Sequence, residues 1–565
     1  MDPALALKII NSGKTPQITN WIPLGDTDTL PIRLYTSFFI HPIKSRQEEY
    51  ESCILGNSFL EQHIFVETDE AENWIRTNAP KAVIYRTTTT PVFQNFFDAG
   101  ENGYINIVAN ADILFNETIF RTQCALLDKV VLCLGKWNVI EKDVIIPYTY
   151  VGSQDVWIWK GILVVPRVFN FKMGIPGCDN RIAAELNAAG YKIANVMADI
   201  VAIHKHVTEI RSSPKEAVSP PYAAVVPTFL TVSIPRSVNL YSVPFRYLDT
   251  ILHIGYPMTQ LQDEFKKYCR NYIFLHRDSP NLNSKVIAAF SNNTPNIVFC
   301  QLQAAGILGI EVIKTMRQNK TYMINWTGDA RRPIPSWYKE YAPFFDITLF
   351  SNETDVQEMR SLGFRSAFWN IGFETKLYDP LAPAYLNHDI VFMGNNYPGA
   401  FPLSSLRSDM VNKLKTEFGS SFHVFGNGWG TTCTNEQQES CIYRGSKIAI
   451  SLSHYDLERY FSDRMLRIMG CSTLCLTKWY PGIEKDFTDG VDVVVWRDLP
   501  DLIAKIHYYL KNPKERFIIA RGGFLRVTLE HTWSIRMGQL QYVIDEYPQQ
   551  IPVPKKFKLI KFLRS

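Results

Sequence analysis

Short apolar runs alternate with amphipathic segments along most of the chain. The apolar runs predict strands, and the segments between them have the spacing of helices. Strands that alternate with helices are typical of parallel sheets, so the pattern predicts an α/β fold. The main predicted strands are residues 32–40, 61–68, 82–87, 104–110, 130–139, 191–196, 296–303, 321–329, 346–352, 388–397, 422–430 and 492–496.

A proline-rich segment interrupts this alternation. Residues 212–245 contain six prolines, a density that disfavours helices and central strands, and we interpret 212–246 as a linker. A chain of 565 residues is too long for one hydrophobic core, so several domains are expected. The predicted division is a leader at 1–30, domains at 31–211, 247–380 and 381–545, and a basic tail at 546–565.

The stretch from Ser462 to Glu484 combines a helical face, a short apolar run and a Pro-Gly turn followed by an acid. In a doubly wound α/β domain, such a turn lies at the carboxyl end of a strand, where ligands bind. A Gly-Asn-Asn turn ends the strand at 388–397 and can present backbone N–H groups to a phosphate. Both features predict a phosphate or sugar site in the last domain.

Composition and charge narrow the function classes without selecting one. Charged residues make up 20% of the chain and the net charge is +4, which is weak evidence for a polyanionic partner. The ten cysteines include no CxxC pair, so a zinc or thioredoxin-like site has no support. No apolar run reaches the roughly 18 residues needed to span a bilayer, and the N-terminus lacks a secretory pattern. We expect a cytoplasmic protein, in the host cytoplasm if the source is a virus.

The strand at 104–110 ends in Asn110, and Asp112 follows two residues later. Side chains two residues apart on an extended chain point to the same side. Such a pair suits a divalent ion that bridges to a diphosphate, because Mg²⁺ and Mn²⁺ take oxygen ligands. The alternative is that the two side chains only cap the end of the strand.

The motifs that follow this strand end carry a family resemblance. They are the segments SQDVWIWKG at 153–161 and GIPGCDNR at 174–181, and the closing HKH at 204–206. Over residues 31–210, the chain resembles GT-A-type glycosyltransferases, although it has Asn-Ala-Asp where the family has an Asp-x-Asp motif. The resemblance implies a GT-A-like Rossmann-type domain with a nucleotide-sugar donor.

The resemblance also implies roles for individual residues. Asp112 would contact the divalent metal and, with Asn110, the nucleotide sugar, and His206 or His204 would be the second metal ligand. Two more acids, Asp155 and Asp179, would lie nearest the acceptor hydroxyl, where a carboxylate can take a proton. The alternatives are a turn acid at Asp155 and a helix-capping acid at Asp179. Trp157 and Trp159 beside Asp155 are expected to offer flat surfaces for stacking a sugar or base.

A second resemblance covers residues 290–540, which are similar to GT-B-type glycosyltransferases of the spore-maturation kind, with a family 4-like architecture. The resemblance implies a GT-B-like pair of Rossmann domains, the first for the acceptor and the second for the nucleotide. The motifs that carry it are INWTGDARRPIPSW, DITLFSN, IVFMGNN, HVFGNGWG, YFSDRMLRIMGC and YPGIEKDFTDGVDVVVW.

The site residues implied by this second resemblance are Gly394 and Asn395 at the phosphate turn, Gly426 at the next strand end, Arg464 and Lys447 on the diphosphate, and Glu484 on the sugar or ribose. The guanidinium of Arg464 suits a diphosphate because it binds phosphate bidentately. One departure stands out, since Arg467 occupies the position where an acid that grips the ribose is expected. The alternatives are a surface ion pair at Arg464 and a plain helix acid at Glu484.

Together the two resemblances predict a bifunctional glycosyltransferase that moves sugars from nucleotide-diphosphate donors to a glycan or another hydroxyl acceptor. We expect a divalent metal, Mn²⁺ or Mg²⁺, in the first half and none in the second. One alternative is that only one half is catalytic and the other holds the acceptor. Another is glycosylation of modified bases in viral DNA, which the basic tail KKFKLIKFLR would favour.

Overall fold

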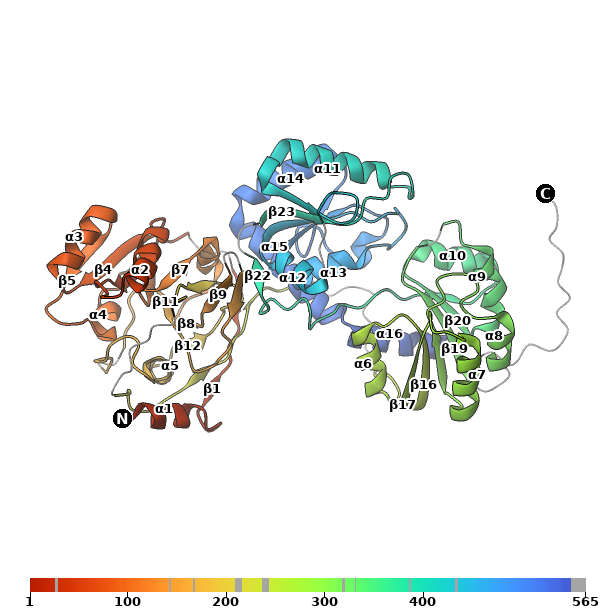
Figure 1. The fold of residues 1–565 in the computed structure, drawn as a ribbon, viewed down its shortest axis with the longest axis horizontal. Helices are drawn as coiled ribbons and strands as arrows, with labels where there is room; N and C mark the ends of the chain where they lie inside the picture. Colours follow the sequence, from red (N-terminus) through yellow and green to blue (C-terminus); the bar gives the residue numbers. More distant parts are fainter. Residues whose placement is uncertain are drawn as a thin grey trace.

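The chain folds into three α/β units, seen here in a computed structural model. The C-terminal unit, residues 388–530, lies between the other two in Figure 1. The N-terminal unit is formed by residues up to 235, and the middle unit by residues 243–370 with the last helix, α16. The structure describes residues 1–25, 29–141, 144–165, 168–208, 216–235, 243–317, 321–330, 332–385, 388–431 and 435–549. The predicted α/β class with parallel sheets is confirmed.

The N-terminal unit is built on a seven-stranded sheet in the order β5-β4-β3-β6-β11-β8-β12. Its strands are β3 (Ile32–Ser37), β4 (Glu61–Val66), β5 (Val83–Arg86), β6 (Ile105–Ala109), β8 (Val130–Leu134), β11 (Val156–Lys160) and β12 (Lys192–Ala194). Six strands run in one direction and β11 runs against both neighbours. The helices of this unit are α2 (Lys44–Gly56), α3 (Asp69–Asn78), α4 (Phe93–Asp98) and α5 (Cys178–Ala188).

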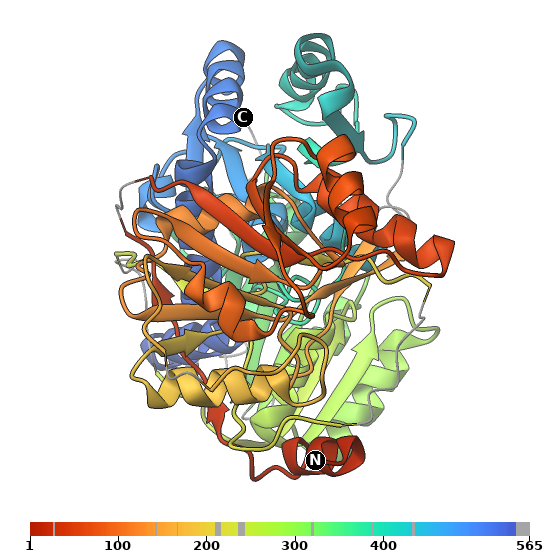
Figure 2. The ribbon, with the colours of Figure 1, turned by 90° about the vertical axis from the view of Figure 1, so that its left-hand side faces the viewer.

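A second sheet, ordered β22-β10-β9-β13-β7, lies at one end of the first. Its strands are β7 (Ile113–Phe115), β9 (Trp137–Glu141), β10 (Val144–Pro147), β13 (Ala202–His204) and β22 (Ala384–Tyr385). The strand β22 lies beyond the predicted boundary near 380, in the connection to the C-terminal unit. Because β22 pairs with β10, this connection is part of a sheet of the N-terminal unit. Figure 2 shows the N-terminal unit in front, with the other units behind.

The leader and the proline-rich segment are parts of the N-terminal unit. After helix α1 (Pro3–Ile10), the leader strands β1 (Gln17–Ile18) and β2 (Ile22–Pro23) pair with β14 (Ala224–Val225) and β15 (Leu230–Thr231). Val225 and Leu230 are fully buried. The described residues 216–235 of the predicted linker therefore pair with the leader. Apolar residues between the prolines pair in two-residue strands, and proline is tolerated at such edges.

The middle and C-terminal units each contain a fully parallel sheet. The middle sheet has the order β17-β16-β18-β19-β20-β21, and the C-terminal sheet has the order β24-β23-β25-β26-β27. The strands are β16 (Leu248–Gly255), β17 (Cys269–His276), β18 (Ile297–Cys300), β19 (Tyr322–Thr327), β20 (Ile347–Phe350), β21 (Ser366–Phe368), β23 (His388–Met393), β24 (Phe422–Phe425), β25 (Ser446–Ser451), β26 (Leu474–Lys478) and β27 (Val494–Trp496).

Helices cover these sheets and join the units. They are α6 (Thr259–Lys267), α7 (Leu282–Asn293), α8 (Ile310–Arg317), α9 (Ser336–Tyr341), α10 (Glu353–Ser361), α11 (Ser404–Phe418), α12 (Glu436–Arg444), α13 (Asp463–Gly470), α14 (Leu499–Lys511), α15 (Pro513–Glu530) and α16 (Trp533–Glu546). Helix α16 returns to the middle unit, where Trp533 and Met537 join the core of its sheet. Helix α16 was predicted to belong to the domain at 381–545, but it packs in the middle unit.

Helix α15 fastens the C-terminal unit to the N-terminal one. Arg516 pairs with Glu117 at 2.8 Å, and Arg521 forms a fully buried ion pair with Asp199. Because a buried charge is costly unless it is paired, these ion pairs favour one arrangement of the two units. Among the described residues, no helix has both the length and the apolarity for a membrane crossing. Residues 550–565, most of the predicted basic tail, lie outside the described residues.

Candidate functional sites

The first candidate site lies at the carboxyl end of β6. Asp112 is almost fully buried there, and three side chains approach its Oδ2 atom. Arg46 Nη2 lies 2.5 Å from that oxygen, His204 Nε2 lies 3.2 Å away and His206 Nδ1 lies 3.9 Å away. Asp112, His204 and His206 each offer a ligand atom, and these atoms lie within 4.8 Å of one another. The structure therefore brings together the acid and both histidines that the sequence analysis singled out.

Strand pairing explains how residues so distant in sequence meet. Strand β13 runs antiparallel to β7, with His204 opposite Ile113, and the Lys205 N–H donates to the Asp112 carbonyl at 2.9 Å. Burial pushes the pKa of Asp112 upward, but His204 and Arg46 outweigh it and hold that pKa well below its usual range. Asp112 is therefore an anion at neutral pH, ready to face a cation.

Asn110 does not join this cluster. Its Nδ2 donates to Asp155 Oδ1 at 2.7 Å, across the β6–β11 pair. The other oxygen of Asp155 lies 3.3 Å from Lys136 Nζ. The Gln154 N–H donates to Asp179 Oδ2 at 3.3 Å, so Asp179 lies close behind Asp155. Asn110, Asp155 and Asp179 thus form a second polar group at the same edge of the sheet.

The carboxyl of Asp179 is shifted towards its neutral form. Loss of hydration, reinforced by the negative charge of Asp155, raises the pKa of Asp179 to about 7. A carboxyl group with a pKa near neutrality can exchange a proton with a substrate. The expected stacking surfaces are absent, because Trp157 and Trp159 are fully buried and pack edge-on against Phe93 and Phe97.

The second candidate site is a cavity of about 290 Å³ at the carboxyl edge of the C-terminal sheet. Gly394 follows β23 and Gly426 follows β24. Because β23 and β24 are neighbouring parallel strands, the turns after them lie side by side. Gly426 has a φ of +138°, and a Cβ there would lie 2.5 Å from the Gly394 carbonyl oxygen. Asn395 and Arg464 also line the cavity. Four of the predicted nucleotide residues therefore lie together.

Arg407 and His454 extend this group and were not predicted from the sequence. Arg407, on α11, donates from Nη1 to the Asn395 carbonyl at 3.0 Å and from Nη2 to the Leu452 carbonyl at 2.6 Å. Arg464 donates to the same Leu452 oxygen at 3.2 Å. Neither guanidinium has a carboxylate within ion-pair distance among the residues that the structure describes. A helix that starts after the Gly-Asn-Asn turn and carries an inward arginine was the available signal.

Arg407 and Arg464 act electrostatically on each other and on His454. Burial, together with the nearby Arg464, lowers the pKa of Arg407 to about 9. Burial and the two guanidiniums lower the pKa of His454 to about 4, so this ring is neutral at pH 7. Two partly desolvated cations at a strand edge attract an anion, and guanidinium geometry matches phosphate.

Arg467 lines the cavity but is neutralised. It pairs with Asp463 at 2.7 Å, one helical turn earlier, and with Glu439 of α12 at 2.8 Å. Glu439 thereby enters the cavity wall from a different helix. A cavity of about 160 Å³, also lined by Asp463, leads between the C-terminal and middle units to Trp326 and Asp329.

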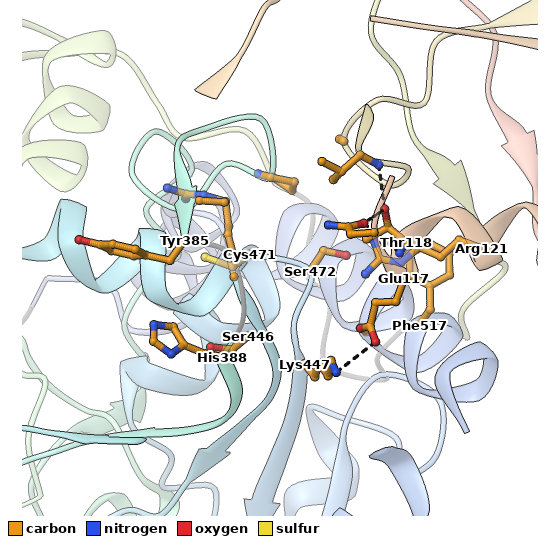
Figure 3. A pocket seen from close by; sticks show the side chains of 18 of the residues that line it. Glu117, Thr118, Arg121, Tyr385, His388, Ser446, Lys447, Cys471, Ser472 and Phe517 are labelled. Carbon is orange, nitrogen blue, oxygen red and sulfur yellow. Dashed lines mark hydrogen bonds and ion pairs between the residues drawn. The ribbon is translucent and has the colours of Figure 1, made fainter. Parts of the chain in front are cut away.

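Two of the residues predicted to bind the nucleotide sugar lie away from the cavity beside Arg464. Lys447 is at the amino end of β25, where it pairs with Asp389 at 2.9 Å and with Glu117 of the N-terminal unit at 3.2 Å. Figure 3 shows the Lys447–Glu117 pair beside a cavity of about 310 Å³ between the N-terminal and C-terminal units. The two ends of a parallel strand lie at opposite edges of the sheet, which separates Lys447 from Arg464. Glu484 is exposed and lines none of the cavities described here.

Comparison with known proteins places part of the chain near glycosyltransferases. Residues 407–541, which include Arg407, Glu439, Asp463 and Arg464, match the family model described as glycosyl transferase-like. This match supports a glycosyltransferase for the C-terminal unit. A search of curated proteins found no match.

Solved structures with partial similarity include three bacterial proteins. A glycosyltransferase from Rickettsia africae is 12% identical, with a TM-score of 0.40, over 54% of this chain and all of its own. Anabaena Alr3699/HepE, in complex with UDP, is 8% identical with a TM-score of 0.39, over 53% of this chain and all of its own. Sucrose-phosphate synthase from Thermosynechococcus elongatus is 10% identical with a TM-score of 0.38, over 53% and 98%. Scores this low do not establish a shared fold for the chain as a whole.

Proposed function

We propose that the protein is a glycosyltransferase whose C-terminal unit binds the diphosphate of a nucleotide-sugar donor. The observation that carries this proposal is the Arg407–Arg464 pair, two guanidiniums without carboxylate partners among the described residues, at the carboxyl edge of a parallel sheet. Ligands of open α/β sheets bind at that edge. The match of residues 407–541 to a glycosyl transferase-like family model supports the same assignment.

The chemistry follows from the charge of the leaving group. When the bond between the anomeric carbon and the diphosphate oxygen breaks, negative charge develops on the diphosphate. Arg407 and Arg464 stabilise that charge without reorganising, because hydrogen bonds to Leu452 and Asn395 already hold them. The acceptor oxygen then bonds to the same carbon, and its proton passes to the departing diphosphate.

The cleft toward the middle unit suits the acceptor. The cavity that contains Asp463 continues to Trp326 and Asp329 at the carboxyl end of β19, and Tyr460 and Phe461 line its other side. Aromatic faces with polar edges suit sugar rings. We assign the acceptor to this cleft and the donor to the cavity beside Arg464.

We further propose a second donor site in the N-terminal unit, of the GT-A-like kind, with a divalent ion held by Asp112, His204 and His206. One carboxylate and two imidazoles fit Mn²⁺ better than Mg²⁺, which prefers oxygen ligands. A bound ion would act as a Lewis acid toward the departing diphosphate. Asp155, with Asp179 close to it, is the acid that we assign as the base at this edge.

Donor turnover by the full chain tests both assignments. A thermal-shift screen of nucleotide sugars, with and without Mn²⁺, first identifies a donor that binds. Arg464→Gln and Asp112→Asn are then compared separately with Arg497→Gln, an exposed arginine of the same unit as Arg464. We expect Arg464→Gln to remove turnover at the C-terminal site and Asp112→Asn to remove any Mn²⁺-dependent turnover. If neither change lowers turnover, the protein is not the enzyme proposed.

One observation favours a second candidate for the N-terminal unit. Arg46 already pairs with the carboxylate that a metal would need. An N-terminal unit that only positions the acceptor for the C-terminal site would be expected to bind a glycan without Mn²⁺. Retained turnover in Asp112→Asn, with all Mn²⁺ dependence absent in the unmodified protein, would favour this alternative.

A further inference from the structure

Arg46 contacts the acid of the predicted metal cluster. It belongs to the first turn of α2, and only 5% of its side chain is exposed. Its Nη2 lies 2.5 Å from Asp112 Oδ2, the same oxygen that His204 and His206 face. A divalent ion such as Zn²⁺ lies about 2.0–2.2 Å from the carboxylate oxygen that binds it. An ion on this oxygen would therefore lie in close repulsive contact with the guanidinium.

The other side of the Arg46 guanidinium is tied to a second element. Its Nη1 lies 2.5 Å from Glu49 Oε2 and donates to the Lys205 carbonyl at 3.3 Å. Glu49 in turn accepts hydrogen bonds from the Val207 and Thr208 N–H groups, both at 2.8 Å. Arg46 and Glu49 therefore join α2 to the segment that carries both histidines.

The charges of this group permit an exchange of cations. Asp112 and Glu49 carry two negative charges, and Arg46 neutralises one of them. A divalent ion added beside Arg46 would leave an excess positive charge in a buried place, whereas a divalent ion that displaces Arg46 would leave the group neutral. Glu49 would keep its two backbone donors after Arg46 leaves, so the displaced state retains a partner for each acid.

The position of Arg46 on its helix also favours its displacement by a metal ion. A cation in the first turn of a helix opposes the helix dipole, so α2 itself does not favour a positive charge there. The two carboxylates and the Tyr50 ring, whose centroid lies 4.4 Å from the guanidinium carbon, hold Arg46 in place. Removal of one carboxylate interaction would weaken that hold.

We propose that Arg46 is an internal competitor of the divalent ion: it closes the Asp112–His204–His206 cluster, and a metal binds only when the guanidinium leaves Asp112. This inference rests on the proposed metal site. It assigns to Arg46 the role of setting the metal affinity, and it couples metal binding to the contact between α2 and residues 205–208.

Mn²⁺ binding to the full chain, followed by electron paramagnetic resonance and calorimetry, tests the inference without a donor or acceptor. We expect Arg46→Gln to bind Mn²⁺ about tenfold more tightly than the unmodified protein, the lower end of what partners of metal ligands contribute. Arg76→Gln is the matched control, because Arg76 pairs with Glu72 on the exposed surface of α3. Asp112→Asn should bind no Mn²⁺.

The outcomes separate this inference from the metal site itself. Equal or weaker Mn²⁺ binding by Arg46→Gln overturns the role of Arg46 and leaves the metal site standing. No Mn²⁺ binding by either protein overturns both. A rescue measurement distinguishes competition from a general structural effect: millimolar guanidinium should weaken Mn²⁺ binding to Arg46→Ala but not to the unmodified protein.

A charge-retaining variant covers the case in which the neutral variants do not fold. Arg46→Lys keeps the positive charge but lacks the planar fork that contacts Asp112 and Glu49 at once. We expect its ammonium to be displaced more readily, with Mn²⁺ affinity between those of the unmodified protein and Arg46→Gln. Affinity equal to that of the unmodified protein would contradict the inference.

Discussion

The two candidate sites lie at the carboxyl edges of two sheets and have opposite electrostatics. In the N-terminal unit, a buried acid and two imidazoles face one point, and the nearby cation, Arg46, is paired with that acid. In the C-terminal unit, Arg464 lines a cavity and the buried Arg407 shares its Leu452 carbonyl contact, and neither guanidinium has a carboxylate partner among the described residues. A diphosphate would need an added cation at the first site and none at the second.

Under the proposed function, two different architectures would bind one kind of ligand. A mixed sheet with a strand end at Asp112 presents carboxylate oxygen, which recognises phosphate only through a metal. A parallel sheet whose turns meet at Gly394 and Gly426 presents backbone and guanidinium groups, which recognise phosphate directly. The following predictions break or sharpen that contrast, beginning with the largest expected effect.

The double variant Arg407→Gln/Arg464→Gln should weaken binding of nucleoside diphosphates at the C-terminal site by roughly 100-fold or more, because each charged hydrogen bond contributes about 1.5–3 kcal/mol. Calorimetry on the full chain measures this loss. Mn²⁺ binding at Asp112 should be unchanged, and Arg497→Gln serves as the control. Equal losses at both sites would show that the sites are not independent.

Gly426→Ala should destabilise the protein by about 2–3 kcal/mol, because the new Cβ meets the Gly394 carbonyl and the backbone lies at a positive φ. Gly430→Ala is the matched control: Gly430 also has a positive φ, +86°, but its Cβ would meet nothing within 4 Å. Urea unfolding compares the two. A loss no greater than that of the control would contradict the close contact between the turns.

Asp179→Asn should change the pH dependence of stability. The folded pKa of Asp179 is raised to about 7, so its contribution to stability is fully present below the unfolded pKa and is lost as pH rises through 7. The amide cannot ionise, so the variant should gain up to about 4 kcal/mol relative to the parent between pH 4 and pH 8, because the folded and unfolded pKa values differ by about three units and each unit is about 1.4 kcal/mol. Melting temperatures across this range measure it.

Asp69→Asn is the control for that comparison, because Asp69 is exposed. A parallel shift in both variants would show that the effect arises from net charge. A gain at pH 4 and not at pH 8 would contradict the raised pKa of Asp179.

Lys447→Gln should have the smallest effect. Its ion pairs with Asp389 and Glu117 are partly exposed, and such pairs contribute about 0–1 kcal/mol. Nucleoside diphosphate binding should be unchanged, which thermal melts and calorimetry on one preparation can check. A tenfold loss of nucleotide affinity would instead support the predicted contact of Lys447 with the diphosphate.

Local sequence accounts for the elements and for part of each site. Alternating apolar runs determine the strands, and the residue after each strand is a natural ligand position, which is why Asp112, Gly394 and Gly426 could be found. The closing histidines were found through a family resemblance. The mutual contact of Asp112, His204 and His206 follows from the antiparallel pairing of β7 with β13, which has no local signal in the sequence.

What the chain determines by itself is its alternation of strand and helix, because side-chain period depends only on neighbouring residues. Tertiary structure alone decided which charges meet. It placed Lys447 at the opposite edge from Arg464, buried Trp157 and Trp159, brought Arg407 beside Arg464 and paired Arg46 with Asp112. The reason is physical: the cost of burying a charge or an indole depends on partners that arrive from distant parts of the chain.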